Sequence, residues 1–103
     1  MTIRAEAEPA FIRLLQQVLD GSELATGQLV RTYGPCVART VRRKLDRQMR
    51  GKFDSDDFTQ VVWADFFAHP SRWADFRHPK QLTALLQRMA RNKVVDEHRR
   101  RMT

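Results

Sequence analysis

The sequence of 103 residues contains a single cysteine, Cys36. One thiol excludes an intramolecular disulfide and any metal site built from several thiolates. Free cysteines usually behave as small, buried apolar side chains, and we favour this interpretation for Cys36. A reactive nucleophile is the alternative.

Long apolar runs are also lacking, although 42% of the residues are hydrophobic. No run approaches the roughly 18 residues that a membrane-spanning helix requires. The first residues, Met1 to Glu6, lack the basic start and apolar stretch of a secretory signal. We therefore expect a soluble, cytoplasmic protein with no membrane contact.

Acidic residues are few: 12 Asp and Glu stand against 19 Lys and Arg, which gives a formal net charge of +7. A chain of this length buries roughly two-thirds of the surface that its unfolded form exposes, enough for one modest core. We expect one small basic domain without a large cofactor-binding fold, and no cofactor.

Strand patterns are absent, because apolar residues recur at spacings of three and four rather than two. The fold class predicted is all-α, a small bundle of about four to five helices whose last helix is long and basic. A leader helix within residues 1–21 carries Pro9 at its first position and ends at Gly21. Its apolar stripe is Phe11, Leu14, Leu15, Val18 and Leu19.

Ser22 can cap a second helix, which Gly34 and Pro35 are predicted to interrupt. This helix offers Leu24, Leu29, Val30 and Tyr33 as apolar surface. A third helix is then expected from Pro35 to Met49, with Val37, Val41 and Leu45 facing inward. The rest of its surface is basic: Arg39, Arg42, Arg43, Lys44, Arg47 and Arg50.

Residues 54–57, Asp-Ser-Asp-Asp, place acids and a capping side chain at a helix start, where free amide protons and the positive end of the helix dipole lie. The helix that follows is apolar on most of its circumference and is expected to end before Pro70. One face, with Phe58, Val62 and Phe66, can enter the core. The remaining residues, Gln60, Val61 and Trp63, need other cover, which a partner protein could supply.

Residues 69–80 form a predicted loop that contains two aromatic side chains, Trp73 and Phe76. These rings can pack back onto the core. Alternatively, they can stack on unpaired bases.

The last helix is expected from near Pro79 to about Arg101. Its apolar arc is Leu82, Leu85, Leu86, Met89 and Ala90, and its opposite arc holds Arg88, Arg91, Asn92 and Arg99, with Asp96 at the border. Six basic and two acidic residues lie between Arg88 and Arg101. The basic arc is either a solvated face or a surface for phosphates and base edges, to which arginine is well suited.

Two of these segments resemble the second conserved region of bacterial RNA polymerase sigma factors, most closely the extracytoplasmic-function group. The first is residues 54–63, Asp-Ser-Asp-Asp-Phe-Thr-Gln-Val-Val-Trp, and the second is residues 85–100, with Ala-Arg-Asn at 90–92 and Asp96 before trailing arginines. With the preceding basic helix, the resemblance covers about residues 24–101. It implies that residues 22–103 form a region 2-like helical domain, which the leader helix precedes.

The resemblance implies a non-enzymatic domain that binds core RNA polymerase and recognises the promoter minus-ten element while the duplex opens. Asp57 and Gln60 match residues that dock on the coiled-coil clamp helices of the largest polymerase subunit. Val61, where the family often has Glu, and Trp63 are assigned to the same surface. The resemblance also implies a set of residues that contact the non-template DNA strand. These are Trp73, Phe76, Arg88, Arg91, Asn92, Asp96, Arg99 and Arg100.

The resemblance leaves some questions open. In this group a further helix-turn-helix domain reads the minus-thirty-five element, so we expect the sequence to be the first domain of a longer protein. An anti-sigma protein is a possible further partner.

Three other functions remain as alternatives. The first is a stand-alone basic module that binds nucleic acid without polymerase. The second is an enzyme that uses His69, His78 or His98, which lack metal-binding spacing with a carboxylate. The third is a bundle that binds only proteins.

Overall fold

The structure, a computed structural model, describes the backbone of residues 2–45 and 55–102 and the side chains of residues 9–45 and 55–100. These residues form four α-helices and one short 3-10 helix, and they contain no strand. The elements are α1 (Thr2–Leu19), α2 (Glu23–Lys44), α4 (Ser55–Ala68), η1 (Pro70–Arg72) and α5 (Pro79–Met102). The predicted all-α fold class is confirmed.

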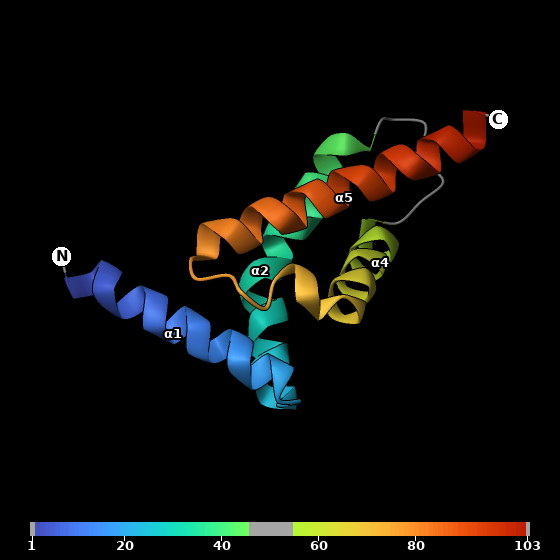
Figure 1. The fold of residues 1–103 in the computed structure, drawn as a ribbon. Coiled ribbons are helices and arrows are strands. Elements are labelled where there is room, and N and C mark those ends of the chain that lie inside the picture. Colours follow the sequence, from blue (N-terminus) through green and yellow to red (C-terminus); the bar gives the residue numbers. More distant parts are fainter. Residues whose placement is uncertain (1, 46–54, 103) are drawn as a thin grey trace.

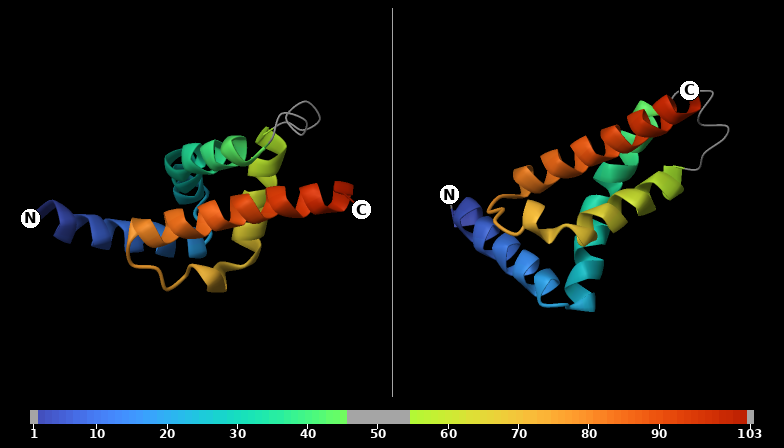
Figure 2. Two further views of the ribbon diagram at one scale, coloured as in Figure 1. Left: turned by 90° about the horizontal axis from the view of Figure 1, so that it is seen from above. Right: turned by 45° about the vertical axis from the view of Figure 1, so that its right-hand side comes forward.

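Helix α2 is the centre of the arrangement, because it packs against α1, α4 and α5. Helix α5 lies across α2, and α4 packs against both of them (Figure 1). Helix α1 packs on the first half of α2 and points away from the other helices, so the two ends of the chain lie at opposite ends of the molecule (Figure 2). Helices α2, α4 and α5 therefore form the body that carries the candidate site.

Apolar side chains from all four α-helices and from the loop before α5 form the core. The inward positions predicted for α2 and for α4 are buried, as is the predicted apolar arc of α5: Val37, Val41, Leu45, Phe58, Val62, Phe66, Leu82, Leu85, Leu86, Met89 and Ala90. Val94 extends the arc of α5 by one more turn. Helical periodicity alone was sufficient to identify these residues.

Two leucines of the predicted apolar surfaces are exposed. Leu19 is 42% exposed and Leu24 is 81% exposed. Both lie beside the turn between α1 and α2, at a corner that no other described helix covers (Figure 1). An isolated exposed leucine is common on protein surfaces and needs no special explanation.

Helix α2 continues through Gly34 and Pro35, so the predicted interruption is wrong. A proline inside a helix removes one backbone hydrogen bond and costs about 3 kcal/mol. Leu29 before this point and Val37 after it are both fully buried, and their packing outweighs the local cost. Pro9 likewise lies inside α1 rather than at its start, since α1 begins at Thr2. The predicted basic residues Arg47 and Arg50 lie outside the described residues.

The turn between α1 and α2 depends on two small residues. Gly21 has a φ of +90°, in the left-handed region that glycine enters without steric cost. Ser22 caps α2: its side-chain oxygen accepts a hydrogen bond from the backbone N–H of Ala25 at 3.1 Å. The predicted end of the first helix and the predicted cap are both confirmed.

Replacing Gly21 with alanine is expected to lower the free energy of unfolding by about 1–2 kcal/mol, because a Cβ is unfavourable at positive φ. No atom lies within 4 Å of the added Cβ, so the loss would come from backbone strain alone. The matched variant Gly27→Ala, inside α2, is expected to raise it by about 0.5–1 kcal/mol. The added Cβ would lie 3.2 Å from Nη1 of Arg31, the far end of an exposed side chain that can move aside. Urea denaturation of both variants measures the two changes in the free energy of unfolding. Changes of the same sign would contradict this prediction.

The start of α5 is fixed by two side chains, that of Gln81 in its first turn and that of His78 directly before it. The backbone N–H groups of Arg77 and His78 donate to Oε1 of Gln81 at 2.8 and 3.0 Å. The N–H of Lys80 donates to Nδ1 of His78 at 3.0 Å. These bonds satisfy amide groups that a helix start leaves without partners, and they fix the loop at the beginning of α5.

Candidate functional site

The outer face of α4 is a narrow exposed strip. Asp57, Gln60 and Val61 are exposed and recur at helical spacing with Ala64 and Ala68, which are exposed too. Val61 presents 49% of its surface, although it is apolar. A shallow pocket formed by Asp57, Phe58, Val61 and Glu97 connects this strip to α5. The strip offers a carboxylate, an amide and an apolar side chain to a partner.

Trp63 does not belong to this strip, so its predicted exposure is wrong. Its side chain is only 7% exposed and stacks on Phe67 at a centroid distance of 5.7 Å, with an edge contact to Phe66 at 5.4 Å. Its position lies near the buried arc of α4, and the neighbouring rings of the same helix cover it. Its indole Nε1 is buried without a hydrogen-bond partner.

Trp73 belongs to the core. Its side chain is 2% exposed, its ring stacks on Phe66 at 4.6 Å, and its indole N–H donates to the carbonyl oxygen of Phe66 at 2.9 Å. The ring is therefore not available to stack on a base, and the prediction of that role is wrong. Phe76 is half-buried and packs against the same core. Sequence reasoning could not separate the two interpretations, because loops have no periodicity.

Helix α5 carries the predicted polar face. Arg88, Arg91, Asn92, Asp96 and Arg99 are all exposed. Arg100 is exposed as well, and its Nη1 donates to Oε2 of Glu97 at 3.2 Å. The structure thus leaves six of the predicted DNA-binding residues exposed along α5, of which Arg88, Arg91, Asn92 and Arg99 share one arc. Trp73, in contrast, is buried in the core.

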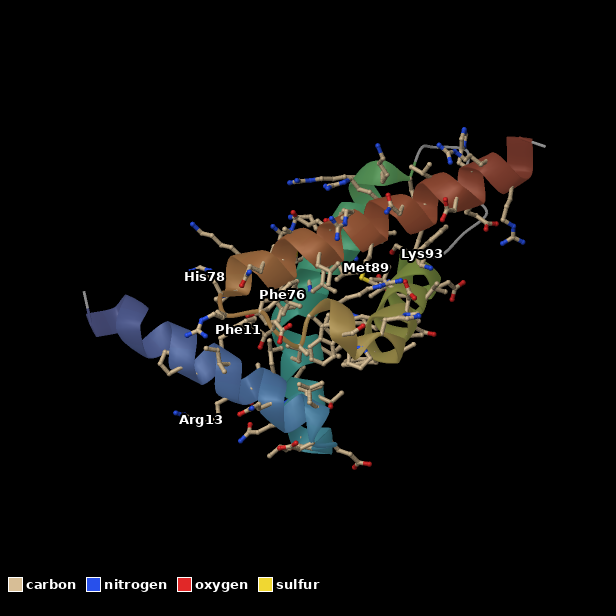
Figure 3. All side chains as sticks on the ribbon, viewed as in Figure 1. Phe11, Arg13, Phe76, His78, Met89 and Lys93 are labelled. Atoms are coloured by element: carbon tan, nitrogen blue, oxygen red, sulfur yellow. The ribbon has the colours of Figure 1, made fainter. Side chains whose placement is uncertain are left out.

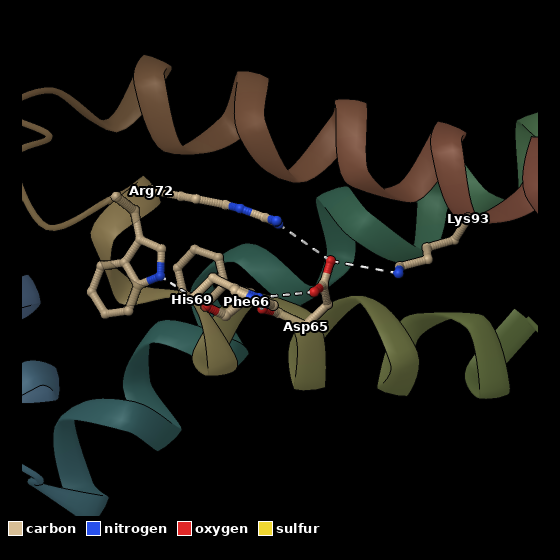
Figure 4. Close-up of polar contacts among 6 residues, drawn as sticks. Asp65, Phe66, His69, Arg72 and Lys93 are labelled. Atoms are coloured by element: carbon tan, nitrogen blue, oxygen red, sulfur yellow. Dashed lines mark hydrogen bonds and ion pairs between the residues drawn. The ribbon is translucent and has the colours of Figure 1, made fainter.

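A second group of charged residues lies between α4, η1 and α5, where sequence reasoning identified no site. The carboxylate of Asp65 contacts Nδ1 of His69 at 3.0 Å, Nη1 of Arg72 at 3.5 Å and Nζ of Lys93 at 3.5 Å (Figure 4). Lys93 and Met89 lie on the side of α5 that faces α4 (Figure 3). The spacing of four residues between Asp65 and His69 was the one local signal for this cluster. The expectation that no histidine has helical spacing with a carboxylate is therefore wrong for His69.

The Asp65 cluster borders a groove between α4 and α5. Its lining combines charged, amide and apolar side chains: Asp65, Arg72, Leu85, Arg88, Met89, Asn92, Lys93 and Asp96. Three of the predicted DNA-binding residues, Arg88, Asn92 and Asp96, therefore share the groove with the Asp65 cluster.

Helix α2 adds basic residues to the surface. Arg39, Arg42, Arg43 and Lys44 are exposed along its last two turns. Burial raises the pKa of the half-buried Tyr33 above its ordinary value, so the phenol stays neutral and does not offset this charge. Cys36 is half-buried rather than buried, and its Sγ accepts a hydrogen bond from Nε2 of Gln87 at 3.7 Å.

The histidines are engaged in structural contacts. His78 accepts a bond at the start of α5, and His69 donates from Nδ1 to Asp65. Among the described residues, no group of three or more His, Cys, Asp or Glu side chains could hold a metal ion. None of the described helices is long and apolar enough to span a membrane.

Comparison with known proteins agrees with the resemblance found in the sequence. The family model described as ECF sigma factor matches residues 8–103, which is almost the whole chain. Searches of curated proteins and of solved structures gave no significant match. ECF sigma factors are not enzymes, and they act in transcription initiation by binding core RNA polymerase and promoter DNA. This chain belongs to the ECF sigma factor family.

Proposed function

We propose that this chain binds the clamp helices of core RNA polymerase through the outer face of α4 and the non-template strand of the minus-ten element through α5. One observation carries this proposal: α4 and α5 pack on each other, and each presents exposed residues of a different character, the strip of α4 and the basic face of α5. Both partners can therefore be held at once, in a fixed relative orientation.

The strip of α4 has the composition of a protein-binding surface. Gln60 can donate and accept hydrogen bonds, and the exposed Val61 beside it can bury apolar area in an interface. Where the family often has Glu, Val61 would replace one polar contact by an apolar one. An anti-sigma protein would have to cover the same strip to block polymerase.

The face of α5 has the composition of a nucleic-acid-binding surface. Arg88, Arg91 and Arg99 are exposed around Asn92, so they can contact phosphates while the amide of Asn92 contacts a base edge. Phosphate contacts fix the position of the strand, and the base contact supplies sequence preference. Asp96 borders this face and can orient neighbouring arginines.

A domain with this surface favours strand opening by binding one strand better than the closed duplex. Extruding one base from the stack costs a few kcal/mol. Stacking on an aromatic ring is worth roughly 1–3 kcal/mol per base. With Trp73 in the core, the half-buried Phe76 is the remaining aromatic candidate of the loop for stacking on an extruded base.

The test is a titration of labelled chain against bacterial core RNA polymerase, followed by fluorescence anisotropy. Saturable binding that unlabelled chain competes away would support the proposal. A folded chain that does not bind polymerase but binds duplex DNA at moderate salt would contradict it and favour the stand-alone nucleic-acid-binding module.

Replacing Asn92 with alanine is expected to reduce discrimination among minus-ten sequences by about 1–3 kcal/mol while total affinity falls less. Arg91→Ala is expected to weaken binding of all sequences alike and to reduce the salt slope by about 0.7, the contribution of one phosphate contact on a single strand. Binding of each variant, with polymerase present, to a set of single-stranded oligonucleotides at several salt concentrations checks both results. Equal, sequence-independent losses in the two variants would exclude a reading role for Asn92.

A further inference from the structure

The Asp65 carboxylate joins three parts of the molecule. Its oxygens lie 3.0 Å from Nδ1 of His69, directly after α4, and 3.5 Å from Nζ of Lys93 in α5. Oδ2 also accepts a hydrogen bond from Nη1 of Arg72 in η1 at 3.5 Å (Figure 4). The His69 Nδ1 also lies 3.0 Å from the carbonyl oxygen of Asp65, and because both partners are acceptors, Nδ1 carries the proton. The carboxylate therefore fixes the loop after α4 against the groove-facing side of α5.

The groove bordered by this cluster is nearly neutral, in contrast to the outer face of α5. Its lining contains three cations, Arg72, Arg88 and Lys93, and two carboxylates, Asp65 and Asp96, which gives 3 − 2 = +1. Two of the three cations are engaged by Asp65. Among the described residues, Arg88 and Arg91 form no ion pair. Arg88 is thus the one lining cation that Asp65 does not engage, and it also belongs to the exposed arc of α5 that carries Arg91. Unpaired positive charge therefore lies where the groove meets the outer face of α5 and on that face.

We propose that Asp65 is a positioning residue that determines what the groove accepts. By holding Arg72 and Lys93, its carboxylate takes the place that a phosphate would otherwise occupy and repels an incoming phosphate. The groove therefore favours an uncharged group that forms hydrogen bonds, which we identify as an unpaired base next to Asn92. The phosphates bind the outer arginines instead. This inference rests on the proposed function, since it assigns a determinant of selectivity to the same DNA-binding surface.

The decisive variant is Asp65→Asn, which keeps the shape of the side chain and removes its charge. The groove lining would then carry three cations against one carboxylate, or 3 − 1 = +2. We expect the variant to bind single-stranded DNA of any sequence more tightly, with a salt slope steeper by about 0.7 as one more phosphate is contacted. We expect its preference for a selected sequence over a random pool to fall about tenfold, which is the discrimination that one good base contact supplies.

The measurement uses the chain bound to core RNA polymerase. A random pool of short single-stranded DNA is selected on the wild-type complex, and the selected and unselected pools are then titrated against each variant. Asp75→Asn is the matched control. Asp75 is an exposed carboxylate in the loop between η1 and α5, and it lies outside the cluster and the groove. It changes the net charge equally, and we expect it to keep the preference for the selected pool.

A second variant tests whether charge or folding is responsible. Adding Lys93→Gln to Asp65→Asn returns the charge of the groove lining to 2 − 1 = +1. If the groove works through its charge, the double variant recovers the preference that the single variant lost. A purely structural role for Asp65 predicts a further loss instead.

The outcomes separate the two proposals. If the wild-type complex enriches no sequence over core polymerase alone, the proposed function fails, and the inference fails with it. If the wild-type complex enriches a sequence and Asp65→Asn keeps the full preference, the inference about Asp65 is overturned while the proposed function stands. A double variant that stays as unselective as Asp65→Asn would also overturn it.

Discussion

Replacing Trp73 with alanine is expected to lower the free energy of unfolding by about 3–5 kcal/mol, the usual cost of truncating a buried aromatic side chain. The ring of Trp73 is 2% exposed and stacks on Phe66 at 4.6 Å. Its indole N–H also supplies the hydrogen bond to the carbonyl of Phe66 near the end of α4. Since small domains have a total stability of about 5–15 kcal/mol, a large fraction would be lost.

Urea denaturation followed by circular dichroism measures this loss directly. The control is Trp73→Phe, which keeps an aromatic ring against Phe66 but removes the N–H donor. We expect it to cost about 1–3 kcal/mol, because the indole hydrogen bond and part of the buried ring area are lost. The carbonyl of Phe66 keeps one donor, the backbone N–H of His69 at 3.3 Å. A stable Trp73→Ala variant that has lost only its minus-ten preference would contradict the buried position and restore the base-stacking role.

Much of the fold could be predicted from the sequence, because helical periodicity and capping act over a few residues. The apolar arc of α5 and the inward positions of α4, such as Val62 and Phe66, follow from spacings of three and four. The turn at Gly21 and Ser22 follows from the special backbone freedom of glycine and from the capping side chain. Each of these features is decided within one or two helical turns.

The errors concern features that depend on tertiary contacts. Gly34 and Pro35 disfavour a helix locally, but the packing of Leu29 and Val37 against other helices keeps α2 continuous. Trp63 stands at the edge of the buried arc of α4, and it is covered because it joins the core cluster that the helices form together, in addition to its contacts with Phe66 and Phe67. No local pattern in the sequence contains this information.

In the candidate site, too, local features could be predicted from the sequence and contacts between helices could not. The exposure of Gln60 and Asn92 follows from their helical positions, and the structure agrees with it. The Asp65 cluster does not follow, because it joins Asp65 to Lys93, 28 residues later in the chain. The position of a charged residue on its helix does not reveal a partner that lies on another helix. Such a cluster can therefore be recognised only when the relative positions of the helices are known.

Replacing Gln60 with alanine is expected to weaken binding to core RNA polymerase by at least about tenfold, as for a central polar residue of an interface. The melting temperature should hardly change, because Gln60 is exposed on α4 and surface substitutions usually alter stability by less than about 0.5 kcal/mol. The anisotropy titration against core polymerase and a thermal melt of the same sample measure the two quantities.

The matched control is Gln28→Ala, which removes the same exposed side chain from α2, beside the turn between α1 and α2 and outside the strip of α4. Its affinity for polymerase should equal that of the wild-type chain. Equal losses in both variants would mean that polymerase binding does not depend on the strip of α4. A Gln60→Ala variant that unfolds early would place the side chain in the core, against its observed exposure. Only a selective loss of affinity in a stable Gln60→Ala variant is consistent with a direct contact, because the exposed strip is the part of α4 that contributes little to folding.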